Sequence, residues 1–186
     1  GGTGNDTFIL RGSVASGTVA TILSTASRIS DFTVGASASV GDVLQLSATA
    51  GNYAGGGAQF VAGIAAAAAG STAVQTVAAN ASAAAYVAGT DLIKLTTATT
   101  TATTFQAAFN AAIGTATVTS TGTNDDQVFF TLYDSTNSRM EVGIVRAGAG
   151  DQTIATGDTV VLIGSVNMTA ADYANFGANN LSIIAS

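Results

Sequence analysis

The stretch DQVFFTLYDSTNSRMEVGIVRAG (126–148) carries the clearest β-strand pattern in the chain. Residue character alternates along both arms, and the polar segment DSTNS separates them. Two alternating runs joined by a short polar segment are typical of a β-hairpin. We therefore predict a hairpin over these residues.

Other short runs rich in branched or aromatic residues predict further strands. Turn-forming Gly, Asp, Ser or Asn residues flank most of them, as expected for short strands joined by tight connections. The predicted strands are RISDF (28–32), DVLQLSA (42–48), DLIKLTT (91–97), GDTVVLIGSV (157–166) and LSIIAS (181–186).

Two short helices have clear boundary signals. In FQAAFNAAI (105–113), large apolar residues recur every four positions, with Thr residues before the segment and Gly114 after it. The segment NMTAADYANFG (167–177) carries Thr169 as an N-cap and Asp172 three residues later, which predicts a helix start.

An Ala-rich region predicts additional helix. GAQFVAGIAAAAAG (57–70) has a helix-forming composition and ends at a glycine. The next segment, STAVQTVAANASAAAYVAG (71–89), begins with a serine that is a candidate N-cap. Both segments together predict an Ala-rich helical insertion at about residues 57–88.

Three segments share Gly and Asp ahead of a hydrophobic strand: GDVLQL (41–46), GTDLIKL (89–95) and GDTVVLI (157–163). We interpret them as a common turn, in which Asp caps the turn and Gly supplies a positive φ. A duplicated unit is the alternative.

Composition excludes several functions. The chain has 186 residues, a net charge of −6 and only five Lys and Arg, spread singly, so nucleic-acid binding is not expected. It contains no Cys, His, Pro or Trp. Disulfides, thiolate chemistry and a His-based triad are therefore excluded, and we do not expect an enzyme.

Ala, Thr, Ser, Gly and Asn take the place of Lys and Glu over much of the sequence. A surface of such residues is inexpensive to desolvate and suits packing against copies of itself, although drift toward these residues gives the same composition. The Ala-dominated stretch 61–89 is too weakly apolar for a membrane span, and no N-terminal secretory signal pattern is visible.

The first nine residues, GGTGNDTFI (1–9), fit the nonapeptide G-G-x-G-x-D-x-U-x at every specified position. Glycines let the backbone turn tightly and direct carbonyl oxygens inward, and Asp6 adds a carboxylate. These are the oxygen ligands that Ca²⁺ prefers. A phosphate-binding loop would need a following helix or a Gly-Lys pair, and neither follows. An ordinary Gly-rich turn is the remaining alternative to a calcium-binding repeat.

Together with RISDFTVG (28–35) and GDVLQLSA (41–48), the segment GGTGNDTFIL (1–10) resembles the end of an RTX (repeats-in-toxin) calcium β-roll. The later segments VFFTLYD (128–134), GDTVVLIGSVNMTAADY (157–173) and LSIIAS (181–186) resemble C-terminal modules of type I-secreted surface proteins, including surface-layer proteins and adhesins. The resemblance implies export by type I secretion machinery through an uncleaved C-terminal signal, and folding driven by extracellular calcium at the cell surface.

A single rung supplies only half of such a site, because a β-roll holds each ion between rungs. The missing ligands come from upstream residues, from the turns at Asp31 or Asp42, or from a neighbouring molecule. The candidate Ca²⁺ ligands are therefore Gly1, Gly2, Gly4, Asp6, Asp31 and Asp42. We interpret the acidic turn at 124–126 as a solvated turn, with a second calcium site as the alternative. The loop between Asp151 and Asp158 is a weaker candidate for a further site.

The expected fold is mainly β, with a β-roll-type start that leads into a β-sandwich or β-sheet module with a few short or Ala-rich helices. Residues 1–50 are expected to form the terminal calcium rung and its capping strands, and residues 51–186 a β-rich C-terminal module. The expected function is calcium-assisted self-assembly into a homopolymeric surface layer, sheath or filament. The alternative is an accessory secretion and folding module of a larger secreted RTX enzyme or adhesin.

Overall fold

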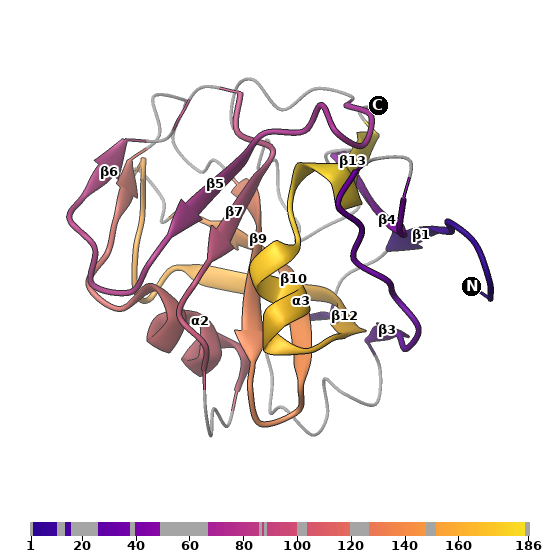
Figure 1. Ribbon diagram of the computed structural model, residues 1–186. Coiled ribbons are helices and arrows are strands. Elements are labelled where there is room, and N and C mark those ends of the chain that lie inside the picture. The colour runs from indigo at the N-terminus through magenta and orange to yellow at the C-terminus, as the bar shows by residue number, and fades with distance from the viewer. Residues whose placement is uncertain are drawn as a thin grey trace.

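The computed structural model describes residues 2–10, 14–15, 26–37, 40–48, 67–85, 87, 89–99, 104–119, 127–147 and 152–184 (Figure 1). These residues form three β-sheets and two α-helices, so the predicted mainly β fold with few helices is confirmed. The strands are β1 (Thr7–Leu10), β2 (Val14–Ala15), β3 (Ser27–Ile29), β4 (Val43–Ser47), β5 (Val74–Val77), β6 (Ala84–Ala85), β7 (Leu92–Leu95), β8 (Val118–Thr119), β9 (Gln127–Asp134), β10 (Arg139–Arg146), β11 (Thr153–Ile154), β12 (Thr159–Asn167) and β13 (Leu181–Ile184). The helices are α2 (Phe105–Ile113), α3 (Ala170–Asn175) and the 3₁₀ helix η1 (Ala178–Asn180).

The largest sheet, which we call the central sheet, is built around the predicted hairpin. Its strand order is β2-β12-β10-β9-β7-β5, and β3 also pairs with β12. Strands β9 and β10 pair antiparallel along their full lengths, which confirms the hairpin over the DSTNS turn. Nearly every residue of β9, β10 and β12 is buried, because both faces of this sheet are covered.

Helix α2 covers one face of the central sheet. The Phe105 and Phe109 rings lie 5.5 and 4.9 Å from the Phe130 ring of β9, measured between centroids. Gly143 of β10 permits this approach, since a Cβ there would lie 2.7 Å from the Phe105 ring. Burial of each Phe contributes about 2–3 kcal/mol, so this contact fixes α2 on the sheet.

Both predicted short helices are confirmed with their caps. The Thr104 hydroxyl accepts a hydrogen bond from the Ala107 N–H at the start of α2, and Gly114 ends that helix with a positive φ of 58°. At the start of α3, Thr169 and Asp172 form the reciprocal capping box that their spacing predicts.

The Ala-rich helix predicted at about 57–88 is wrong in its described part. Residues 74–77 and 84–85 form β5 and β6 instead, and residues 57–66 lie outside the described residues. Strand β5 pairs in parallel with β7, and Val77 enters the buried core beneath α2. The β-branched residues of β5 fit a sheet, and this long-range pairing outweighs the helix propensity of the alanines around them.

A second sheet, which we call the terminal sheet, joins the two ends of the chain. Its order is β1-β4-β13, and both pairings are parallel. Together with α3 it covers the other face of the central sheet, around a core that includes Leu44, Phe129 and Tyr173. The division expected at residue 50 therefore does not separate the sheets, since strands from both sides of it pair.

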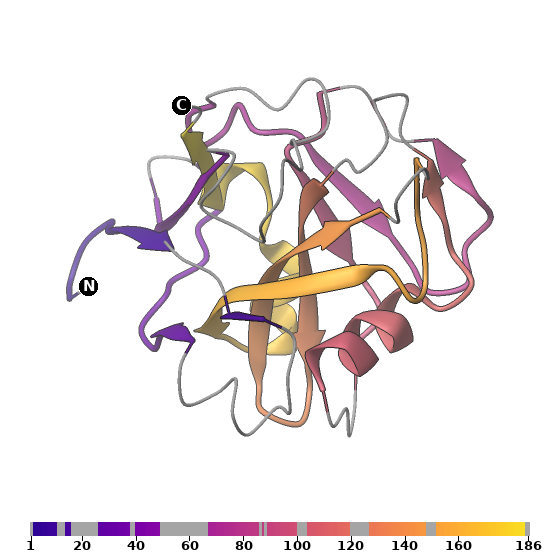
Figure 2. The ribbon, with the colours of Figure 1, turned by 180° about the vertical axis from the view of Figure 1, so that it is seen from behind.

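The third sheet is small and lies at the end of the molecule beside α2 (Figure 2). Its order is β11-β8-β6, and each strand has two residues. Neither helix in the described part of the chain has the length and apolarity needed to cross a bilayer.

Candidate functional site

The predicted calcium rung lies directly against β4. Thr7 aligns with Val43 in the parallel register, so Asp6 comes beside Asp42. The Asp6 backbone N–H donates to Asp42 Oδ1 at 2.8 Å, and the Gly41 N–H donates to Asn5 Oδ1 at 3.0 Å. The residues ahead of the two strands are therefore joined by side-chain contacts as well as by the sheet.

Asp42 holds three segments together. Its side chain is buried, and its second oxygen, Oδ2, accepts a hydrogen bond from the Thr33 backbone N–H at 2.7 Å. Because one carboxylate accepts from both Thr33 and Asp6, the 31–33 segment is held beside the N-terminal rung. We assign Asp42 a structural role on this geometry.

Two further aspartates from the segments that share the Gly and Asp pattern also accept backbone N–H groups. Asp91 Oδ2 accepts from the Ala73 N–H at 2.8 Å, and Asp158 Oδ2 accepts from the Ala155 N–H at 2.8 Å. Burial raises the pKa of the Asp91 carboxyl, and the Ala73 hydrogen bond opposes that shift. The accompanying glycines have positive φ angles of 96°, 84° and 95° at Gly41, Gly89 and Gly157. The positive φ angles predicted for these glycines are confirmed. Asp158 caps its own turn, whereas Asp42 and Asp91 accept N–H groups from distant segments instead.

Asp6 and Asp31 remain as the carboxylates nearest to the glycine turn. The pKa of the exposed Asp31 carboxyl is lowered, in part by a hydrogen bond from the Gly2 N–H. Gly2 and Gly4 have φ angles of 115° and 132°, which favour glycine. The structure thus brings Gly2, Asp31, Asp6 and Asp42 into one region.

Gly1, the turn at 124–126 and Asp151 lie outside the described residues. Within the described residues, no three His, Cys, Asp or Glu side chains gather in a group suited to a metal ion. The donors at the N-terminal edge are therefore two carboxylates and glycine backbone rather than a closed cage. This set has the oxygen chemistry that Ca²⁺ takes, in an incomplete form.

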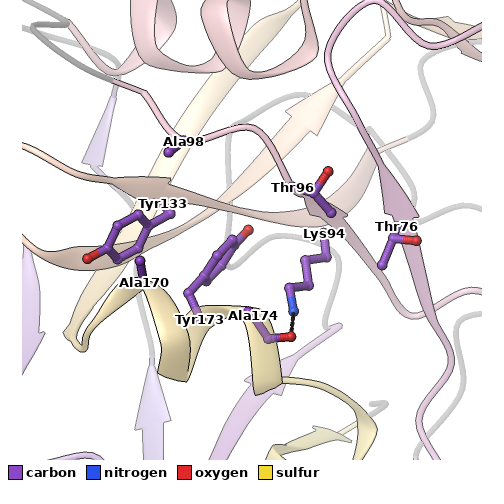
Figure 3. Close-up of a pocket in the computed structure, with 8 residues that line it drawn as sticks. All are labelled: Thr76, Lys94, Thr96, Ala98, Tyr133, Ala170, Tyr173 and Ala174. Atoms are coloured by element: carbon purple, nitrogen blue, oxygen red, sulfur yellow. Dashed lines mark hydrogen bonds between the residues drawn. The ribbon is translucent and has the colours of Figure 1, made fainter.

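A pocket that the sequence does not indicate lies between β5, β7, β9 and α3 (Figure 3). Its volume is ≈ 270 Å³, and Lys94, Tyr133 and Tyr173 are its largest lining side chains. The Lys94 ammonium donates to the carbonyl oxygens of Ala174 and Phe176 at 2.9 and 2.7 Å, and burial lowers its pKa. It also lies 5.0 Å from the centroid of the Tyr173 ring.

The polar groups of this pocket bind backbone. The Tyr173 hydroxyl lies 2.8 Å from the Leu95 carbonyl oxygen and 3.0 Å from that of Thr131, and burial raises its pKa. The Tyr133 hydroxyl donates to the Met168 carbonyl at 3.3 Å. These contacts fasten α3 to the central sheet. We assign the pocket's lysine and tyrosines to that attachment rather than to chemistry.

A buried charged cluster lies at the hairpin end of the central sheet, and the sequence analysis missed it. Arg139 Nε donates to Glu141 Oε1, and Arg139 Nη2 lies 3.4 Å from Asp134 Oδ2. Glu141 Oε2 has no hydrogen-bond partner within the part of the chain that the structure describes. Burial raises the pKa of the Glu141 carboxyl to about 7, against the opposing charge of Arg139. The only sequence signal was two charged residues, two positions apart, on one face of a predicted strand.

Comparison of the chain with protein-family profiles, with curated proteins and with solved structures found no match.

Proposed function

We propose that the protein is an extracellular structural module that binds Ca²⁺ at its N-terminal edge and self-assembles with copies of itself. One observation carries the proposal: the Gly-Asn-Asp rung stacks in parallel on β4 and leaves the Asp6 carboxylate without a hydrogen bond or ion pair among the described residues. A carboxylate in this position is ready to accept a cation or an N–H group.

The residues that would hold the ion are Asp6 and Asp31, with the backbone of Gly2 and Gly4. Ca²⁺ would neutralise carboxylates in a chain whose net charge is already −6. The resemblance to RTX repeats supports calcium and type I secretion to the cell surface, and the composition supports packing between copies. Calcium and the secretion machinery are thus the proposed partners.

Calcium-dependent thermal unfolding tests the site. Extracellular calcium modules have dissociation constants of about 0.1–1 mM, so 10 mM CaCl₂ gives stabilisation of about 1.4–2.7 kcal/mol. For a chain of this length, that raises Tm by about 3–10 °C. We expect Asp6→Ala to remove this rise, and 10 mM MgCl₂ to produce none in the unaltered protein.

Asp172→Ala is the matched control. It removes a carboxylate of the α3 capping box, so it lowers Tm in both buffers by a similar amount and leaves the calcium-dependent rise intact. An unchanged calcium response in Asp6→Ala would contradict the assignment of the site.

Negative-stain microscopy with and without calcium tests assembly. Ordered polymers in calcium are expected. Monodisperse particles at every calcium concentration would contradict self-assembly, and would favour an accessory secretion and folding module of a larger secreted protein.

A further inference from the structure

Strand β1 has one open edge. Within the described residues it pairs only with β4, whereas β13, at the opposite edge of the terminal sheet, is bridged by Ala67. Both views show β1 at the periphery of the molecule, with no drawn strand beyond it (Figures 1 and 2). An open edge presents unpaired N–H and C=O groups to other chains.

The backbone groups at this edge can be assigned from the β1–β4 contact. The Asp6 carbonyl accepts from the Val43 N–H, so the peptide groups of Asp6 face β4. Hydrogen-bonding groups alternate along a strand, and those of Thr7 and Ile9 therefore face the open edge. The Ile9 side chain is 44% exposed on the outer face of the sheet.

The Asp6 side chain lies directly ahead of β1 and supplies a carboxylate acceptor beside this edge. Asp42 precedes β4 and accepts the N–H of Asp6, the residue before the neighbouring outer strand β1. In the same way, Asp91 precedes β7 and accepts the N–H of Ala73, the residue before the neighbouring outer strand β5. Asp6 occupies the equivalent position ahead of β1, and no described residue outside β1 supplies it with such an N–H. Asp6 is therefore a third potential acceptor for the hydrogen bond that the Asp42 and Asp91 carboxylates each accept from a backbone N–H.

We infer that the open edge of β1 binds an extended segment of another chain, which adds as a parallel strand. The backbone N–H of the residue just before this added strand donates to the Asp6 carboxylate. The added segment carries apolar residues at alternate positions, so that it continues the Phe8 and Leu10 side of the sheet over the core that these residues contact. This inference rests on the proposed self-assembly: the added segment is segment 2–10 of a second copy of this chain, which leaves its own β4 to present its Asp6 N–H.

The chain's own segment 2–10 has the required chemistry, because its Asp6 N–H already makes this contact with Asp42. A synthetic peptide GTGNDTFIL is therefore the probe, titrated into the full chain in EDTA. Saturable binding is expected below about 1 mM peptide, as for strand addition to an exposed edge. Absence of saturable binding overturns the inference. Because calcium is absent, that failure is separate from a failure of the calcium site.

Orientation is tested with single-cysteine spin labels, which the cysteine-free chain allows. The label is placed on the protein at Thr7→Cys and on the peptide at Thr3→Cys or Ile9→Cys. Parallel addition in register places the Ile9→Cys label about 8 Å away and the Thr3→Cys label about 14 Å away, before allowance for label length. Antiparallel addition over the same span, with Asn5 of the peptide opposite Thr7, reverses this order and overturns the inference.

Three variants of the protein separate the edge from general effects. Ile9→Pro removes an N–H that faces the open edge and leaves the contacts with β4, so it is expected to abolish peptide binding in a folded protein. Asp6→Ala is expected to weaken binding about tenfold, since a hydrogen bond to a charged group is lost. Asp172→Ala removes the same charge from the α3 capping box and is expected to change affinity less than twofold. Full binding by the Ile9→Pro or Asp6→Ala protein contradicts the inference.

Discussion

Most of the aspartates among the described residues accept backbone N–H groups. Besides the exposed Asp31, five that are at least partly buried do so: Asp42, Asp91, Asp134, Asp158 and Asp172. Such a hydrogen bond contributes about 1.5–3 kcal/mol because its acceptor is charged. The acidic character of the chain therefore reflects turn and strand capping in large part, and Asp6 stands out because its carboxylate caps nothing within the described residues.

Glycines at two capped turns provide a matched pair for a stability prediction. Gly41 and Gly157 have φ angles of 96° and 95°, but only Gly41 is crowded, with a Cβ position 2.4 Å from the Gly35 nitrogen. We expect Gly157→Ala to lower the free energy of unfolding by about 1–2 kcal/mol through backbone strain alone. Gly41→Ala adds a steric cost of about 1–3 kcal/mol. Urea titration of both variants measures the difference, and equal losses would contradict the close approach of Gly35 and Gly41.

Glu141 predicts a pH dependence of stability. Its folded pKa of about 7 lies above the ordinary value of 4.5, so the folded state binds the proton more tightly than the unfolded state. Its stabilising contribution is full below pH 4.5 and is lost as the pH rises through 7. The loss is on the order of 3 kcal/mol. We expect Glu141→Gln to remove it, as measured by urea titration at pH 5 and pH 8.

Asp134→Asn is the control for this prediction, because it changes the other carboxylate that contacts Arg139. Its stability is expected to keep most of the unaltered protein's dependence between pH 5 and pH 8, because burial is the main cause of the raised Glu141 pKa and the Asp134 charge adds less to it. The same pH dependence in Glu141→Gln as in the unaltered protein would show that another group is responsible.

Secondary structure was predictable where local signals agreed. Helix α2 has the predicted bounds, since its apolar spacing, the Thr104 cap and Gly114 are all local features. The β9–β10 hairpin was predictable for the same reason, because alternation and the turn segment lie within one continuous stretch. Agreement between such signals is what makes a segment fold in one way.

The error at 71–85 shows where local reasoning fails. Alanine content favoured a helix, but β5 is stabilised by its parallel pairing with β7 and by the Asp91 contact to Ala73. Neither contact is visible within the segment itself. The alternation of Val74 with Thr76 was the only local sign of a strand, and four residues are too few to outweigh composition.

The candidate site was predictable in its chemistry but not in its geometry. The nonapeptide match identified Asp6 and the glycines, whereas the position of Asp42 beside Asp6 depends on a pairing between distant segments. Side-chain roles differ for the same reason. Asp42 and Asp31 are equivalent in sequence terms, yet one is buried between two backbone N–H groups and the other is exposed.

The terminal sheet makes the whole molecule depend on its C-terminal strand. Strands β1 and β4 belong to the first part of the chain, but β4 is flanked on its other side by β13. Pairings between distant segments form slowly, because the long connecting loop must first close. The terminal sheet can therefore be completed only when residues 181–184 are available to pair with β4.

Removal of residues 181–186 tests this dependence. The deletion takes away Leu181 and Ile183, both buried in the core shared with Leu44 and Leu46. Each loss costs about 2–5 kcal/mol, and together they approach the 5–15 kcal/mol that holds a typical domain folded. We expect β4 amides to lose hydrogen-exchange protection first, before those of the β9–β10 hairpin. Ser182→Ala in the full chain is the control, since its buried hydroxyl has no hydrogen-bond partner among the described residues and its removal leaves protection unchanged. Retained protection of the Leu44 and Leu46 amides in the shortened chain would show that β1 and β4 form a stable unit without β13.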